Sequence, residues 1–388
     1  MDRTVPRRGR VILAAGVLIQ LFTGLPSAWA VLRAPVMDAY SLDAAAAERI
    51  FSFLLGAFGV GGVLGGLLLE GRGPRTAGLL GAGLLGLAFG LAGALPAGHP
   101  LLFYLAFSLP AGLGSAFLLP AVLSCAQKWY AGKKGLATGL IGGASGASGA
   151  VLTLLILQSC GRWGVRACLR LLGAVLTLLC GGGSLLLREP LAQDTPAEQG
   201  LAPRQMLRTR QFRLCLAAVC LSCPAVLLFS PIILELAAQR GLDGASPLLC
   251  VMLGSAASAA GRLTMPLLGD HIGRRRTESL LFAALLLLSA GLWRAQGPWV
   301  IAAYCGLSFC YAGIAGVMPS LCTELFGLAH TGPNCALILL GTTLGSMGFP
   351  LLARTLGLED GRHFIAMAAA AGGLCCIRLL RPLDGPRP

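Results

Sequence analysis

The stretch from Gly66 to Arg75 reads GLLLEGRGPR, and the stretch from Pro266 to Arg275 reads PLLGDHIGRR. In both, an acid is followed three residues later by a glycine, and two residues after that by an arginine. The positions are Glu70, Gly73 and Arg75 in the first stretch, and Asp270, Gly273 and Arg275 in the second. A chance match of two basic loops is the alternative, but the acid and the glycine in register favour an internally duplicated chain.

Apolar segments long enough to cross a bilayer, about 20 residues each, surround both stretches. They lie at 11–32, 50–69, 76–97, 101–126, 135–158, 165–187, 212–235, 246–269, 278–296, 299–326, 334–356 and 362–380. A polar, proline-containing stretch separates the first six from the last six. We therefore predict an all-α membrane protein of twelve transmembrane helices in two pseudo-symmetric halves, 1–188 and 212–388, joined by a cytoplasmic linker, 189–211.

The composition agrees with a lipid-covered chain. Of 388 residues, 56% are hydrophobic and only 12% are charged, whereas soluble domains carry about 25% charged residues. The net charge of +14 does not indicate nucleic-acid binding, because the basic residues are spread among the gaps between apolar segments. Most of the 14 cysteines lie within apolar runs, so we expect small hydrophobic residues and no metal.

The basic residues predict the orientation in the membrane. With the N-terminus inside, the inner segments hold about twice as many Lys and Arg residues as the outer ones, including all three lysines, which places both termini in the cytoplasm. The first apolar run ends in Ala28-Trp29-Ala30 and imitates a signal peptide. Since 11–32 is long enough to span, we interpret it as a retained helix of a bacterial inner-membrane protein.

The two repeated loops resemble the signature of the major facilitator superfamily, found between its helices 2 and 3 and again between helices 8 and 9. The resemblance implies the twelve-helix fold of that superfamily and transport by alternating access, with these loops helping to control the inward-facing and outward-facing states. The alternative is that they are solvated loops that only set the topology.

Further stretches resemble the oxalate/formate antiporter-like branch and its relatives, the monocarboxylate transporters. They are QLFTGLPSAWAVLR (20–33), QKWYAGKKGLATG (127–139), MLRTRQF (206–212), Gly261-Arg262 and LFGLAHTGPN (325–334). The chain departs from that pattern at Pro266, where the family has glycine, and at Glu70, where aspartate is usual. Oxalate carriers also have a lysine in helix 11, but residues 334–348 contain no basic residue, which argues against oxalate.

One charge, Arg262, stands well inside a predicted span, about 12 Å along the helix from Asp270. A charge at that depth is costly unless it faces a cavity or a partner, and a guanidinium matches a carboxylate with two parallel hydrogen bonds. We hypothesise that Arg262 binds a small organic anion, the alternative being a structural or snorkelling arginine. Acidic residues and histidines fall only at helix ends or in loops, which favours exchange or uniport.

The fold that the resemblance implies adds further candidates, from the helices that line its central cavity. The polar or aromatic candidates for substrate contact are Gln20, Trp29, Ser145, Ser148, Tyr311 and Thr342. Each could instead serve helix packing, and Trp29 could belong to the interfacial belt.

The sequence thus favours a monomeric secondary transporter of a small organic anion, a monocarboxylate above all, with no cofactor. An exporter of drugs or other metabolites is the alternative within transport. A membrane receptor is disfavoured by the short tails, and an enzyme by the lack of a catalytic constellation.

Overall fold

The computed structural model describes residues 6–23, 25–190, 200–230, 232–242, 247–356 and 361–381. Regular structure in these ranges is helical, apart from a single bridge between Gly200 and Gly327. The chain divides into two compact units, which are described separately. The first unit comprises Met1–Gly132 and Ala147–Ala197, and the second comprises Lys133–Gly146 and Glu198–Pro388.

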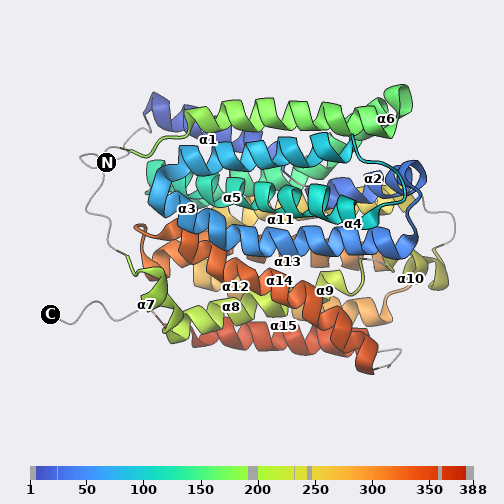
Figure 1. Cartoon of the computed structure of the whole chain (residues 1–388). Coiled ribbons are helices and arrows are strands. Elements are labelled where there is room, and N and C mark those ends of the chain that lie inside the picture. The colour runs from blue at the N-terminus through green and yellow to red at the C-terminus, as the bar shows by residue number, and fades with distance from the viewer. Residues whose placement is uncertain are drawn as a thin grey trace. The chain divides into compact units, whose positions relative to one another are not determined.

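The first unit is built around α3 (Ala44–Ala92), which packs along α5 (Leu109–Trp129) (Figure 1). Its other elements are α1 (Arg7–Leu21), α2 (Leu25–Tyr40), α4 (Pro100–Phe103), the π-helical turn η1 (Tyr104–Ser108) and most of α6 (Lys134–Leu186). Asp43 caps the start of α3 by accepting a hydrogen bond from the Ala46 amide. Several glycines of α3 face α5 closely, so the two backbones approach as in other membrane helices.

The second unit has α11 (Pro247–Ile272) packed on α13 (Pro298–Phe326), which in turn contacts α12 (Arg274–Arg294). Around them lie α14 (Thr331–Leu356) and α15 (Gly361–Leu379), both in contact with α8 (Arg210–Ser222). Short helices α7 (Pro203–Leu207), α9 (Pro224–Leu227) and α10 (Ile233–Gln239) complete it. The first residues of α6, up to Gly146, belong to this unit.

In the described residues, the predicted spans fall largely on helical segments, although two of them are interrupted. The predicted span 11–32 is divided between α1, which ends at Leu21, and α2, which begins at Leu25. In the described residues, eight helical segments are long and apolar enough to cross a membrane. Two of them, α3 and α6, each consist of two helices that meet at a glycine with non-helical backbone, Gly73 and Gly164, and these glycines lie at the predicted boundaries between spans. The predicted span 212–235 is broken into α8, α9 and α10, because Pro224 has no amide hydrogen to continue the ladder of α8. Residues 191–199 of the predicted linker, 189–211, lie outside the described residues.

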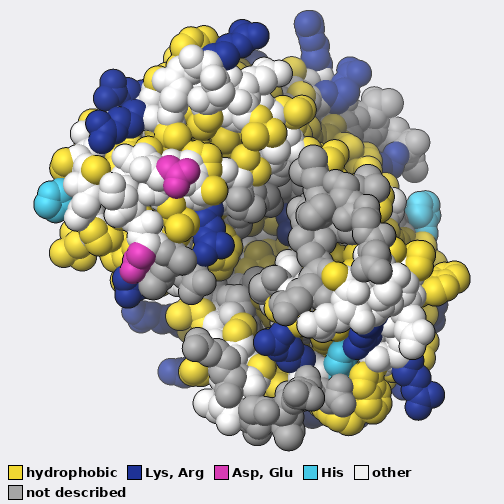
Figure 2. Space-filling view, turned by 90° about the vertical axis from the view of Figure 1, so that its right-hand side faces the viewer, with side chains coloured by type: hydrophobic (Ala, Val, Ile, Leu, Met, Phe, Trp, Pro, Cys, Tyr) yellow, Lys and Arg dark blue, Asp and Glu magenta, His cyan; other side chains and the backbone are white. Residues whose placement is uncertain are grey.

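The helices expose a large apolar surface, which fits a lipid environment. Leu178, Leu287 and Trp299 are 74%, 72% and 74% exposed. Figure 2 views the helix ends at the right-hand side of Figure 1, where basic side chains lie among hydrophobic ones and acidic side chains are sparse. Such a large exposed apolar surface with so few charges would be unfavourable in water.

The two repeated loops share a backbone geometry as well as a sequence pattern. Gly73 has φ 79° and ψ 170°, and it bends α3 at the boundary between two predicted spans. Gly273 has φ 94° and ψ 134°, and it caps the start of α12. Side chains disfavour positive φ strongly, so the glycine of the repeated pattern is required by the turn in both loops.

We expect Gly73→Ala to lower the free energy of unfolding by roughly 1–3 kcal/mol, because its backbone lies in a region that only glycine occupies readily. Thermal unfolding of the detergent-solubilised protein measures the change. Gly83→Ala is the matched control on the same helix, since Gly83 is helical and a Cβ there meets open space. Equal stability of the two variants would contradict the assigned role of Gly73.

Candidate substrate site

Arg262 lies on α11 where that helix meets α13 and the start of α6 (residues 134–146). A Cβ added at Gly316 would be 3.2 Å from the Cα of Arg262, and one at Gly142 would be 3.4 Å from its Cβ. Glycine at these positions therefore lets two helices close on the backbone of Arg262, which limits where its side chain can point.

The guanidinium of Arg262 has few partners among the residues that the structure describes. Its Nη1 donates to the hydroxyl oxygen of Ser145 at 3.4 Å, a long hydrogen bond. Its Nε is buried and has no hydrogen-bond partner in the described part of the chain. Because a guanidinium carries five N–H donors, most of its capacity is open to a ligand.

Tyr311, Cys223 and Thr342 extend the site around Arg262. The phenol of Tyr311, on α13, lies within electrostatic range of the guanidinium and within hydrogen-bonding range of the Cys223 thiol. That thiol also contacts the backbone oxygen of Thr342 at 3.7 Å. The second unit thus brings Arg262, Ser145, Tyr311 and Thr342 into one neighbourhood, with Thr342 contributing through its backbone.

Cys223 is the residue of this group that the sequence did not propose for substrate contact. It follows Ser222, the last residue of α8, and precedes Pro224, so it lies at the break in the predicted seventh span. Proline in the middle of an apolar span is the signal that could have pointed to it, since a broken helix at membrane depth often lines a binding site.

The remaining three predicted contact residues belong to the first unit. Gln20 is 2% exposed, and its side-chain oxygen accepts from the hydroxyl of Thr23 at 2.9 Å. Trp29 is buried and packs on Phe107, with ring centroids 5.8 Å apart. Ser148 is fully buried. A role for these three in substrate binding stays a prediction.

Glycines along the first part of α6 allow α11 to pack closely against it. A Cβ at Gly139 would be 2.6 Å from the backbone oxygen of Leu263, and one at Gly146 would be 2.7 Å from the Cα of Ala259. Neither neighbour is a flexible side-chain end, so no larger residue fits without displacing α11. This close packing sets the position from which Ser145 reaches Arg262.

The loop between α11 and α12 carries an ion-pair network. Arg274 donates to Asp270 at 2.8 Å and to Glu324, on α13, at 2.6 Å. Arg275 instead donates to the backbone oxygens of Ile377 and Arg378, at the end of α15. In this loop the acid of the repeated pattern pairs with the arginine next to the predicted one. A gating role for Asp270, Gly273 and Arg275 stays a prediction.

The corresponding loop of the first unit lies within the long helix α3. Glu70 and Arg75 are exposed, and Gly73 between them makes the bend. Exposed charges at a helix bend are compatible both with the predicted gating role and with a solvated loop. A gating role for Glu70, Gly73 and Arg75 therefore also stays a prediction.

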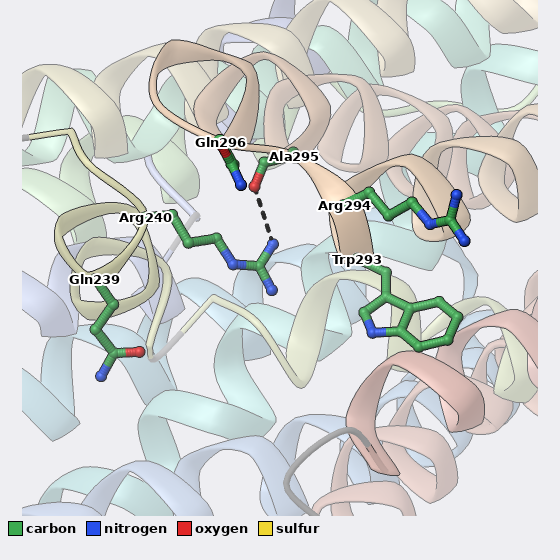
Figure 3. Close-up of a pocket in the computed structure, with 6 residues that line it drawn as sticks. All are labelled: Gln239, Arg240, Trp293, Arg294, Ala295 and Gln296. Carbon is green, nitrogen blue, oxygen red and sulfur yellow. Dashed lines mark hydrogen bonds between the residues drawn. The ribbon is translucent and has the colours of Figure 1, made fainter.

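A pocket of about 540 Å³ lies elsewhere in the second unit, at the ends of α10 and α12 (Figure 3). Arg240 reaches into it and donates to the backbone oxygens of Leu292 and Ala295, the latter at 3.2 Å. Its Nη2 lies 3.4 Å from the Nε2 of His363. These contacts satisfy carbonyl groups at the end of α12, so Arg240 is a helix-capping residue and a weaker candidate than Arg262 for substrate binding.

The comparisons with known proteins extend over most of the chain. The family model described as Major Facilitator Superfamily matches residues 11–350. A protein of Thermoproteus tenax, described as an uncharacterized 38 kDa protein in the 23S RNA operon, is 30% identical over 399 residues, covering 97% of each chain. The MFS-type transporter YhjX of Escherichia coli K12, described as uncharacterized, is 25% identical over 354 residues, covering 88% of this chain and 87% of that protein.

A transporter with a stated substrate is among the relatives. The oxalate:formate antiporter of Oxalobacter formigenes is 24% identical over 336 residues, covering 83% of this chain and 78% of the antiporter. Solved structures also share the fold: the fucose transporter FucP in an outward conformation matches with a TM-score of 0.74 at 15% identity, covering 96% of this chain and 99% of FucP. The proton:xylose symporter XylE matches with a TM-score of 0.73 at 15% identity, covering 97% and 95%.

We expect Gly261→Ala to disturb the site without changing any polar group. Its Cβ would clash with the carbonyl oxygen of Phe309 on α13, so α11 and α13 must separate at Arg262, at a cost of about 1–3 kcal/mol. Thermal unfolding measures this loss. Gly291→Ala, on α12, is the control because a Cβ there meets no atom within 4 Å, and a Gly261→Ala protein as stable as that control would argue against the tight contact.

Proposed function

Since the chain belongs to the major facilitator superfamily, we propose that it carries a small organic anion, a monocarboxylate, across the membrane. The chain is a multi-pass membrane protein and a secondary transporter rather than an enzyme. The observation that carries the proposal is the guanidinium of Arg262, which is half-buried, with a buried Nε that has no partner and one long hydrogen bond to Ser145 among the described residues. An anion would supply the missing acceptor.

The surroundings of Arg262 suit a carboxylate. A carboxylate would accept two N–H bonds from the guanidinium in parallel, and the hydroxyl groups of Ser145 and Tyr311 lie near enough to the guanidinium to add a further donor. In a site partly shielded from water, each charge-assisted hydrogen bond would contribute more than it does in solution. The anion would also offset the cost of burying the arginine.

The number of cations near the site favours a single negative charge on the substrate. Residues 334–348, which form most of the predicted eleventh span, contain no Lys or Arg. A dicarboxylate such as oxalate would leave its second carboxylate without a cation in a low-dielectric site, at a cost of several kcal/mol. The relationship to an oxalate:formate antiporter therefore supports formate-like substrates more than oxalate.

We propose alternating access as the mechanism and the cytoplasmic membrane as the location. The substrate would bind near the midplane and be exposed to each side in turn, with the loops at Glu70–Arg75 and Asp270–Arg275 stabilising one state over another through their charges. Both termini would lie in the cytoplasm, as the distribution of Lys and Arg predicts. One chain contains both halves, so we propose that a monomer suffices.

An exporter of drugs or other metabolites is the second candidate. It is favoured by one observation: Arg262 does contact Ser145 on a neighbouring helix, as a purely structural arginine would. In that case small carboxylates would neither bind nor compete with the true substrate.

We expect Arg262→Lys to weaken formate binding by roughly tenfold or more, because lysine cannot make the paired hydrogen bonds of a guanidinium. Thermal stabilisation by formate and counterflow of labelled formate in proteoliposomes measure the effect. Arg213→Lys is the matched control, since Arg213 is exposed on α8. Formate that stabilises Arg262→Lys as well as the parent protein would remove Arg262 from the site.

We also expect lactate and pyruvate to inhibit the counterflow of labelled formate, and oxalate to inhibit it weakly. The reason is the missing second cation in residues 334–348. Inhibition constants in the same proteoliposomes provide the comparison. If oxalate competes more strongly than lactate, the monocarboxylate assignment is wrong, and if lipophilic cations alone compete, the exporter reading replaces it.

A further inference from the structure

Glu278, in the second turn of α12, is a buried acid that the proposed substrate site does not use. It is 0% exposed, and neither of its side-chain oxygens has a hydrogen-bond partner in the described part of the chain. The sequence placed it at the start of a predicted span, 278–296, and so counted it among charges at a helix end. Its complete burial in the second unit is a finding of the structure.

The guanidinium groups nearest to Glu278 along α12 are engaged elsewhere. Arg274 and Arg275 precede it by four and three residues, so they share its side of the helix. Arg274 bonds to Asp270 and Glu324, and Arg275 bonds to the carbonyl groups at the end of α15. Neither arginine pairs with Glu278 in this state.

The other elements of the core offer thiols in place of cations. Cys215 on α8 lies within electrostatic range of Glu278, and also of Cys335 on α14 and Cys376 on α15. Cys322 on α13 lies close to Cys335 and Cys215. Asp270, near the end of α11, is paired with Arg274. No cation is among the groups that these contacts place around Glu278.

From this arrangement we propose that Glu278 is a proton-binding site and that it is protonated in the conformation seen here. An isolated carboxylate in an apolar core would cost many kcal/mol, and such groups take up a proton instead. Even a neutral carboxyl group with unmade hydrogen bonds is unfavourable, so Glu278 makes this conformation more costly than a leucine would.

Release of the proton would require a second arrangement of the charges at this end of α12. The O–H bond of the Glu278 carboxyl group breaks, the proton passes to water, and a carboxylate remains. Arg274 or Arg275, each about one helical turn away, would then pair with that carboxylate after leaving its present partners. Protonation of Glu278 would thereby be linked to the Asp270–Arg274–Glu324 network of the proposed gating loop.

The inference about coupling rests on the proposed function. Uptake of one proton with one monocarboxylate anion moves no net charge, so a pH gradient alone would drive accumulation. This differs from the expectation, drawn from the sequence, that exchange or uniport is favoured. Glu278, rather than a residue of the substrate site, would carry the proton.

Infrared spectroscopy of the purified protein tests the proton site without any substrate. The carbonyl stretch of a protonated carboxyl group is distinct from that of a carboxylate. We expect such a band in the parent protein at neutral pH. The band should be lost in Glu278→Gln, because glutamine has nearly the same size as glutamate but no carboxyl group to carry the proton. Glu324→Gln is the control and should retain the band, since Glu324 is half exposed and ion-paired. A band that persists in Glu278→Gln would overturn the proposal.

Transport of labelled lactate in proteoliposomes tests the coupling. We expect a pH gradient to drive accumulation by the parent protein but not by Glu278→Gln, while lactate counterflow continues in both. Accumulation by Glu278→Gln equal to that of the parent would exclude Glu278 as the coupling residue. If the parent shows no counterflow, the monocarboxylate assignment fails instead, and the infrared result still decides whether Glu278 holds a proton.

Discussion

The second unit is organised by the cost of keeping charged groups away from water. Arg262 and Glu278 both lie inside it, and in both cases hydrogen-bonding capacity is left unused. In a soluble protein such groups usually lie at the surface, where water solvates them and no cost of burial arises. In a helical unit whose outer surface is apolar, the same groups remain only if a ligand, a proton or a change of partners compensates for their burial.

The close contacts between helices make this arrangement possible. Glycines at 142, 261 and 316 bring α6, α11 and α13 together around the backbone of Arg262. The side chain of Met265 on α11 packs against Gly313 of α13. Backbones packed this tightly hold discrete arrangements rather than a continuous range, which is the property that a carrier with two alternating states needs.

The sequence predicted the helical architecture well, since long apolar runs have no other structure in a bilayer. It also identified Arg262, because a single charge within an apolar span is visible without any structure. Ser145 and Tyr311 followed from the resemblance, and the structure places them near Arg262. A role for these three residues in substrate binding stays a prediction.

The sequence failed where the role of a residue depends on packing between helices. Glu278 lies at the end of an apolar run, and hydropathy cannot tell an acid that faces water there from one that faces the core. Arg240 resembled any basic residue of an outer loop until its contacts with the end of α12 were known. The break at Pro224 was visible in the sequence, but its meaning required the contacts of Cys223 with α13 and α14.

The two repeated loops share a bend at a glycine with positive φ, Gly73 in the first and Gly273 in the second. In each loop the turn depends on a backbone conformation and not on a particular charge. The acid can therefore be glutamate in the first loop and aspartate in the second, while the path of the chain is kept. If the two halves arose by duplication, the glycine at the turn would have been kept in both copies, while the charged residues of each loop could change independently.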